Sequence, residues 1–190
     1  MIKKQIIMGI SAILLLSLLW CLPAVQAEKN ALGKTFYTIA NIWYERPEKI
    51  YSTNYHKGTI LPVGTKVTIK KISGKEIAFS NDSGMDFRIL YVKKHSPGVS
   101  VEDHFDRYFS EKDPMGGGGV FKKFTKKEQD SIKAGTIVEG MSRDAVLMSY
   151  GYPPPVKTSA LDSGQWIFME NKFVTRAVQF KDGKVSSTGR

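Results

Sequence analysis

The chain contains three histidines, and one of them stands between two carboxylates. The run Asp103-His104-x-Asp106 offers an imidazole and two carboxylates, which are ligand types of metal sites. These positions do not share one face of a helix, as ligands at i and i+4 do, so a solvated helix surface explains the run better. His95 begins a loop and His56 lies in a polar turn, and neither belongs to a known catalytic motif. We therefore expect no catalytic residue and no metal ligand.

Four consecutive glycines, residues 116–119, have the composition of a phosphate-binding loop. No Lys-Ser or Lys-Thr pair follows at the required position, and no strand precedes the run, so we expect no bound nucleotide. Ordering four glycines costs much conformational entropy, which favours a linker or a mobile loop. The residues thus give no argument for an enzyme or for a cofactor.

Two short segments have the composition of a binding surface. One is a lysine cluster with an aromatic neighbour, which could contact an anionic membrane at about 1 kcal/mol for each cation. A helix start made soluble by lysines explains the same cluster and is the simpler interpretation. The other is an aromatic-proline corner whose rings could anchor a partner, or could pack over a helix end. The candidate binding residues are Lys122, Lys123, Phe124, Lys126, Lys127, Tyr150, Tyr152 and Pro153.

Residues 1–27 have the pattern of a secretory signal peptide. Two lysines precede an almost wholly apolar stretch, and small residues end the segment at Ala27, where signal peptidase requires them. The apolar stretch is short for a membrane span of about 20 residues. Cys21, the only cysteine, follows Trp20 where a lipidation site needs a small residue, so we expect no lipid there. We expect cleavage after Ala27 and export to the periplasm or cell envelope of a bacterium.

The chain is basic, with 28 Lys and Arg against 18 Asp and Glu and a net charge of +10. In the cytoplasm such a balance often accompanies nucleic-acid binding. Outside the cytoplasm, the available anions are lipid headgroups, wall polymers and acidic proteins. We therefore expect an envelope protein, an anionic lipid or a wall polymer as the partner, no nucleic acid, and a peripheral position on any membrane.

Residues 28–98 have the pattern of short β-strands. Apolar and polar residues alternate in three runs, and turns rich in glycine and asparagine separate them. The runs are 66–70, 76–79 and 87–91. Residues 61–69 resemble the loop-into-strand segment of bacterial SH3-like barrels, which implies a small β-rich module. After it, residues 99–121 predict a helix that begins after Ser100 and then the glycine-rich linker.

The last region, residues 122–190, predicts two helices followed by three strands. Thr125 and Glu128 form a capping box at the first helix start, and Gly135 ends that helix. The second helix begins at Ser142 and stops at Gly151, before three prolines. Two strands at 165–169 and 173–180 precede an Asp-Gly turn into a third strand.

The residues that mark this order resemble the BamE (SmpA/OmlA) family of small envelope proteins. The matching motifs are a helix start, a helix stop and an aromatic strand: Gly140-Met141-Ser142, Gly151-x-Pro153 and Trp166-x-Phe168. The resemblance covers about residues 122–188 and implies two helices on one face of a three-stranded antiparallel sheet. In the best-known members, the domain is an accessory part of the machine that inserts β-barrels into the outer membrane.

Together these patterns predict an exported α+β protein with an SH3-like module and a BamE-like module. The expected function is non-catalytic binding of protein or lipid partners in outer-membrane or envelope assembly. One alternative is a peptidoglycan-binding protein that acts through the SH3-like module. Another is an inhibitor of a secreted enzyme, because the order of helices and strands also resembles small inhibitor modules.

Overall fold

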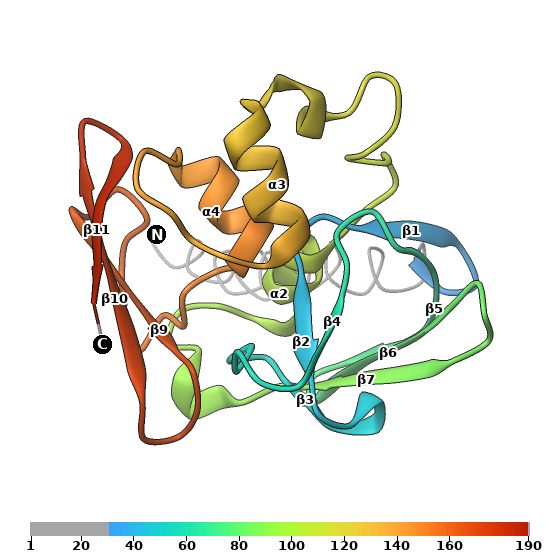
Figure 1. Ribbon diagram of the computed structural model, residues 1–190. Helices are drawn as coiled ribbons and strands as arrows, with labels where there is room; N and C mark the ends of the chain where they lie inside the picture. The colour runs from blue at the N-terminus through green and yellow to red at the C-terminus, as the bar shows by residue number, and fades with distance from the viewer. Residues whose placement is uncertain (1–30, 190) are drawn as a thin grey trace, which may run out of the picture.

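The computed structural model describes residues 31–189, which form an α+β protein (Figure 1). The predicted signal peptide, with Cys21 and the expected cleavage after Ala27, lies outside the described residues. Within residues 31–189, no helix has both the length and the apolar character that crossing a bilayer requires.

A curled six-stranded sheet forms the first half of the fold. Its strand order is β3-β7-β6-β5-β1-β8, and its long antiparallel ladder, β5–β6–β7, covers the three runs predicted from alternation. Inward-facing residues such as Ile69 and Phe79 are fully buried. The strands are β1 (Thr35–Thr38), β3 (Ile50–Tyr51), β5 (Lys66–Ser73), β6 (Glu76–Asn81), β7 (Asp86–Leu90) and β8 (Phe109–Ser110), with β2 (Ile42–Tyr44) and β4 (Thr59–Leu61) as a separate pair.

Helix α2 (Val101–Tyr108) covers this sheet and begins where the sequence predicts. Ser100 and Asp103 form a reciprocal capping box. His104 points inward, is only 4% exposed, and its Nε2 lies 2.9 Å from Ser96 Oγ. The buried imidazole is therefore separated from the exposed carboxylate of Asp106.

The second half contains two helices and a three-stranded antiparallel sheet with the order β11-β10-β9. Figure 1 shows α3 and α4 beside this sheet, and residues of both helices and the sheet share one apolar core. The elements are α3 (Lys126–Ala134), α4 (Arg143–Tyr150), β9 (Gln165–Met169), β10 (Thr175–Lys181) and β11 (Lys184–Gly189). Three single 3-10 turns complete the fold: η1 (Pro47–Lys49), η2 (Lys93–His95) and η3 (Val120–Lys123).

The predicted start of β10 at Phe173 is wrong by two residues. The side chain of Asn171 accepts hydrogen bonds from the backbone N–H groups of Phe173 and Val174, at 2.8 and 3.0 Å. This local turn keeps both residues out of the ladder, so β10 begins at Thr175. Phe173 consequently stands at the hairpin tip with 93% of its surface exposed.

One carboxylate caps both helices of the second half. Glu128 accepts hydrogen bonds from the backbone N–H and hydroxyl of Thr125, which is the predicted capping box. Its other oxygen accepts the N–H and the hydroxyl of Ser142, both at 2.8 Å, at the start of α4. Burial alone would raise the pKa of Glu128, but these four hydrogen bonds outweigh it and lower the pKa to about 2.

The carbonyl groups at the end of α4 are hydrogen-bonded mainly by the first half of the chain. The last four carbonyls of a helix have no partner within the helix. Here Gly151 N–H donates to Leu147 O, but the next two carbonyls accept from the backbone and the side chain of Asn41, at 3.1 and 2.9 Å. Tyr150 O accepts from His56 Nε2 at 2.7 Å and from Asn54 Nδ2 at 3.2 Å.

Asn41 uses its whole side chain at this junction and is 1% exposed. Its amide also donates to Ile132 O near the end of α3, at 2.7 Å, and its oxygen accepts Val63 N–H at 2.8 Å. A buried side-chain amide with every bond satisfied adds specificity because any displacement leaves polar groups without partners. The two halves of the chain therefore meet through one defined hydrogen-bond network.

His56 completes the junction by stacking on Tyr150, with ring centroids 3.6 Å apart and 13° between the ring planes. Burial lowers the pKa of His56 to about 4, against the raising effects of the Tyr150 and Met169 carbonyls and Glu170. The imidazole is therefore neutral at pH 7. Its Nε2 lies 2.7 Å from Tyr150 O and its Nδ1 3.4 Å from Met169 O, so the shorter contact assigns the proton to Nε2.

Replacing Asn41 should destabilise the whole fold. Asn41→Ala leaves the buried Ser149 O and Val63 N–H without their partner and removes one of the two donors to Ile132 O, so we expect a loss of about 3 kcal/mol in the free energy of unfolding. Urea titration of the folded protein measures it. Asn171→Ala removes two side-chain hydrogen bonds from an exposed turn and should cost about 1 kcal/mol or less. Equal losses in the two variants would contradict the role given to Asn41.

Acid should destabilise the fold through its two buried histidines, because burial lowers the pKa of both His56 and His104 to about 4. His56 has a folded-state pKa below its unfolded value, so the unfolded chain binds more protons as pH falls from about 6.5 to about 4, and stability falls across that window. From pH 7 to pH 5 we expect His56 to account for a loss of about 2 kcal/mol. His56→Gln should remove about half of this pH dependence, because the buried His104 has an equally lowered pKa and contributes the rest, whereas His95→Gln, at a partly exposed site, should leave most of it. An unchanged slope in His56→Gln would contradict this prediction.

Candidate functional site

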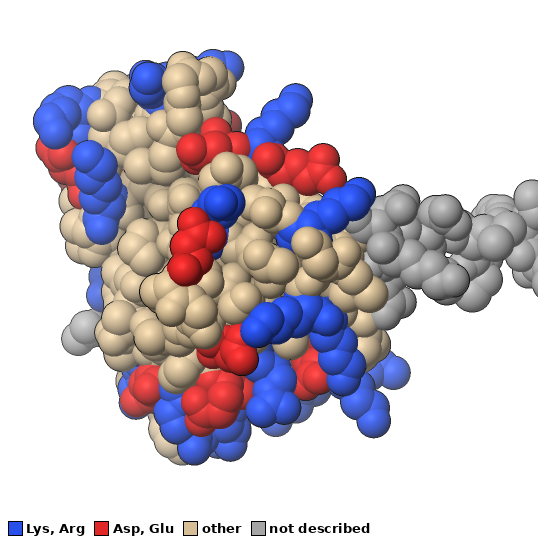
Figure 2. Space-filling model, turned by 90° about the vertical axis from the view of Figure 1, so that its right-hand side faces the viewer, with Lys and Arg blue, Asp and Glu red and all other residues tan. Residues whose placement is uncertain are grey.

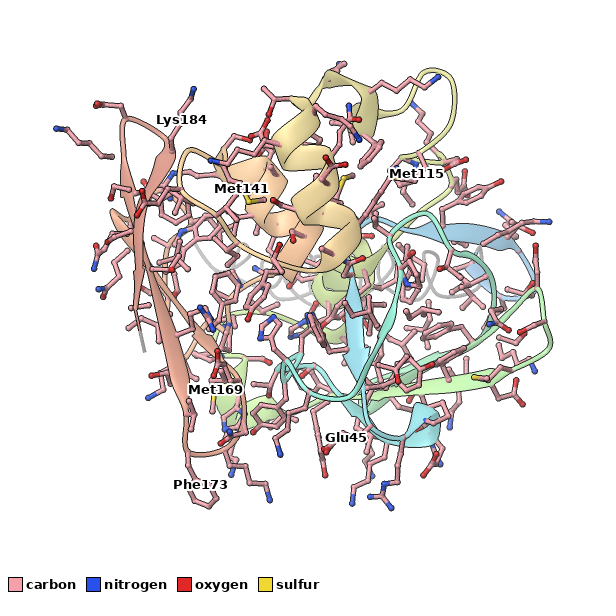
Figure 3. All side chains as sticks on the ribbon, viewed as in Figure 1. Glu45, Met115, Met141, Met169, Phe173 and Lys184 are labelled. Atoms are coloured by element: carbon pink, nitrogen blue, oxygen red, sulfur yellow. The ribbon has the colours of Figure 1, made fainter. Side chains whose placement is uncertain are left out.

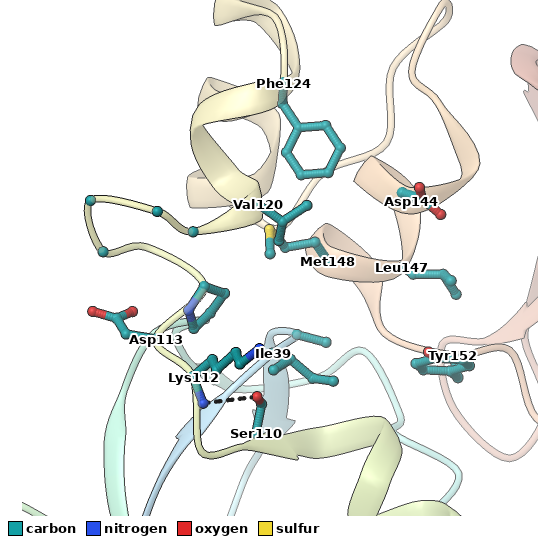
Figure 4. Close-up of a pocket in the computed structure, with 16 residues that line it drawn as sticks. Ile39, Ser110, Lys112, Asp113, Val120, Phe124, Asp144, Leu147, Met148 and Tyr152 are labelled. Carbon is teal, nitrogen blue, oxygen red and sulfur yellow. Dashed lines mark hydrogen bonds between the residues drawn. The ribbon is translucent and has the colours of Figure 1, made fainter.

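A groove of about 760 Å³ lies between the glycine run and helix α4 (Figure 4). We call it the glycine-loop groove. Its lining comes from segments far apart in the chain: the β1–β2 connection, the stretch from β8 to Phe124, one side of α4, and Tyr152. Mostly apolar surface lines it, with Lys112, Asp113 and Asp144 among its few charged residues.

Helix α4 supplies one wall because its two sides have different neighbours. Ala145 and Val146 are fully buried in the core shared with the sheet. Leu147 and Met148 line the groove, and Leu147 keeps part of its surface exposed. Figure 4 shows Leu147 and Tyr152 on this wall, across the groove from Val120. Val120 is 43% exposed, which is a high fraction for an apolar side chain that lines a groove.

The glycine run forms the opposite wall as a hydrogen-bonded turn. Gly119 N–H donates to Gly116 O and Phe121 N–H donates to Pro114 O, both at 3.0 Å. A Cβ on Gly119 would lie 2.1 Å from Pro114 O, so only glycine fits there. A Cβ on Gly117 or Gly118 would meet no atom within 4 Å. At those two positions the wall is bare backbone facing open space.

Tyr152 and Phe124, both predicted as binding residues, line this one groove. Both rings are partly buried, and the guanidinium of Arg107 lies 4.9 Å from the centre of the Tyr152 ring. Burial raises the pKa of Tyr152, against the lowering effect of Arg107, so the hydroxyl stays neutral at physiological pH. The structure therefore brings one residue of each predicted segment to a common hollow.

The four predicted lysines do not form one basic site. Lys126 pairs with Asp130 at 2.6 Å, and Lys127 donates to the Glu139 carbonyl at 2.8 Å, as expected of a solvated helix start. Lys122 and Lys123 are exposed on η3 and do not line the groove. On the face drawn in Figure 2, basic and acidic side chains are intermixed around a largely uncharged area.

Tyr150 and Pro153, the other predicted binding residues, are buried. Tyr150 is 7% exposed and packs against His56 and Phe168, so its ring belongs to the interior and corrects the expectation of a surface anchor. The residues that carry the family resemblance have structural positions. Met141, Trp166 and Phe168 are at most 1% exposed, Gly140 and Gly151 have positive φ, and Ser142 caps α4.

The sequence did not predict that the glycine run forms one wall of the glycine-loop groove. It also did not predict that Ile39 and Leu147 line this groove. The only available signal for Leu147 was its place on α4 beside residues predicted to be core. Nothing local could place Ile39 or Ser110 opposite α4, because that proximity comes from the sheet topology.

A mostly apolar hollow with few polar groups suits an apolar ligand segment, such as part of a protein chain or a lipid acyl chain. Within residues 31–189, no three His, Cys, Asp or Glu side chains are grouped so as to hold a metal ion. Comparison of this chain with protein-family models, with curated proteins and with solved structures gives no match.

Proposed function

We propose that this chain is an exported, non-catalytic binding protein of the bacterial envelope. In this proposal it holds an apolar segment of a protein or lipid partner in the glycine-loop groove and contributes to outer-membrane or envelope assembly. The observation that carries the proposal is the groove itself: about 760 Å³, mostly apolar, with an exposed Val120 and a wall without side chains. The pattern of residues 1–27 supports export.

We further propose that residues 122–190 are a BamE-like module and residues 28–98 an SH3-like module. For the first, the support is two helices that share one core with a three-stranded antiparallel sheet, with the motif residues Met141, Trp166 and Phe168 inside that core. For the second, the support is the curled sheet of short strands, which are antiparallel except for the β3–β7 pair. Because folds host many functions, the proposed role rests on the groove more than on either resemblance.

The position of two exposed lysines next to the groove also fits this proposal. Lys122 and Lys123 lie on η3, which follows directly after the glycine wall, and both are exposed. A partner whose apolar segment entered the groove would bring its flanking anionic groups near these cations. They contribute to approach and orientation, which long-range electrostatics accelerates.

Adding a large side chain to the glycine wall should impair partner capture. Gly118→Trp places a large ring on the bare wall at a position where a Cβ meets no atom and φ is not in the left-handed region, so the fold should tolerate it. A photo-crosslinking amino acid at Val120, in cells that export the protein, should give a discrete protein or phospholipid adduct. We expect Gly118→Trp to reduce that adduct at least tenfold.

Two matched controls keep this experiment specific. Gly74→Trp makes the same change in the β5–β6 turn, where a Cβ also meets no atom, and should leave the adduct unchanged. The crosslinker at Val156, which is 44% exposed against 43% for Val120, should not give the same adduct. An adduct that survives Gly118→Trp, or that forms equally from position 156, would overturn the proposal.

A further inference from the structure

A second hollow, of about 440 Å³, lies between the first half of the chain and the tip of the β9–β10 hairpin. We call it the aromatic cleft. Tyr44, Tyr51 and Tyr55 line it from one side, and Asn171, Lys172 and Phe173 line it from the hairpin. The rings of Tyr51 and Tyr55 contact each other edge to face, with centroids 5.8 Å apart. Each ring therefore has a face that does not contact the other ring.

The cleft has an excess of positive charge. Arg46, Lys49, Lys57 and Lys172 line it, against the single acid Glu45, which pairs with Lys57 at 4.0 Å. In the described part of the chain, neither Lys49 nor Lys172 forms an ion pair. Lys49 Nζ lies 5.9 Å from the centre of the Tyr51 ring, so cation and ring form one surface.

The hairpin tip is held in place, although Phe173 itself contacts little. The turn is closed by Glu170 N–H donating to Val174 O at 2.9 Å and by the two hydrogen bonds to Asn171. Behind the turn, Arg176 pairs with Glu170 at 2.7 Å, with both side chains largely buried. Figure 3 shows Phe173 at the outer end of the hairpin, on the same side of the molecule as Glu45. A 93% exposed ring on a fixed turn at the border of a cleft is poised to contact a ligand.

The neighbouring strands argue against an extended peptide as the ligand. Adding a peptide to a sheet requires an open strand edge. Next to the cleft, β3 is only two residues long, and the backbone N–H of Trp43 in β2 already donates to Asn54 Oδ1 at 3.0 Å. The recognition groups that remain are ring faces and cations. Ring faces stack on the C–H faces of sugar rings, and cations pair with carboxylates.

We propose that the aromatic cleft binds an anionic glycan, a chain of pyranose rings that carries carboxylates. Stacking on Tyr51, Tyr55 and Phe173 would select the sugar rings, and Lys49 and Lys172 would select their acidic groups. This inference rests on the proposed export, because it assumes contact with extracellular polymers. It does not depend on the glycine-loop groove, which is lined by none of these residues.

The test uses the chain from Glu28 onward, which contains every described residue. Purified peptidoglycan sacculi are tested by sedimentation, and oligogalacturonate, neutral chitotetraose and poly-L-glutamate by fluorescence titration. We expect binding to sacculi, to oligogalacturonate or to both, which identifies the source of the glycan. Binding should weaken as salt increases, and chitotetraose should bind at least tenfold more weakly.

The double variant Lys172→Glu/Phe173→Ala should reduce this binding at least tenfold, because both side chains are exposed and their loss leaves the core intact. The matched control is Lys184→Glu/Met85→Ala. Lys184 lies on the same sheet at the opposite end (Figure 3), and Met85 is a 45% exposed apolar residue in the β6–β7 turn. The control should stay within twofold of the parent chain.

Three results would overturn the proposal: no binding to either acidic glycan, equal losses in the two double variants, or poly-L-glutamate binding as tightly as the glycans through the same residues. The last result would assign the cleft to acidic peptides. Gly118→Trp should leave glycan binding unchanged, so failure of the groove proposal and failure of the cleft proposal give different results.

Discussion

The carbonyl groups at the end of α4 must find hydrogen-bond donors, and this requirement joins the two halves of the chain. Three of the four accept from Asn41, Asn54 and His56, which precede them by 94 to 108 positions. A buried carbonyl without a donor costs about as much as a lost hydrogen bond. The carbonyl groups at the end of α4 therefore have donors only when the first half of the chain packs against the helix end.

Both hollows depend on this docking. Ile39 and Ala40, which line the glycine-loop groove, directly precede Asn41. Tyr55, which lines the aromatic cleft, stands between Asn54 and His56, and His56 packs edge-on against Phe168 of β9. A shift of the helix end would thus move one wall of each hollow relative to the other wall. The same few hydrogen bonds that stabilise the fold also determine the shape of both candidate sites.

The features that the sequence predicted well are those with local causes. Capping residues act within three or four positions, so the starts of α2, α3 and α4 could be read from Ser100, Thr125 and Ser142. Strand alternation gave the β5–β6–β7 ladder for the same reason. The second role of Glu128, as a cap for α4, could not be read, because its partner Ser142 is 14 positions away.

The candidate sites were harder to predict because their walls come from distant segments. Tyr150 and Tyr152 are two positions apart, yet one is stacked inside on His56 and the other lines the groove. The aromatic cleft had a usable signal: residues 43–57 interleave aromatic rings with cations, as the segment around Lys122 does. Phe173 lies far from residues 43–57 in the sequence, and only the folded structure brings it next to them.

A structural requirement explains only some of the glycines in residues 116–119. Gly119 is required, because any Cβ there would collide with Pro114 O. Gly117 and Gly118 have neither a left-handed φ nor a close neighbour, so the backbone would accept alanine at both. Glycine at such positions costs about 0.4–1 kcal/mol of stability each, since it widens the unfolded ensemble. Folding gains nothing in return, whereas a wall without side chains lets a ligand approach the backbone closely, which supports a binding role for the groove.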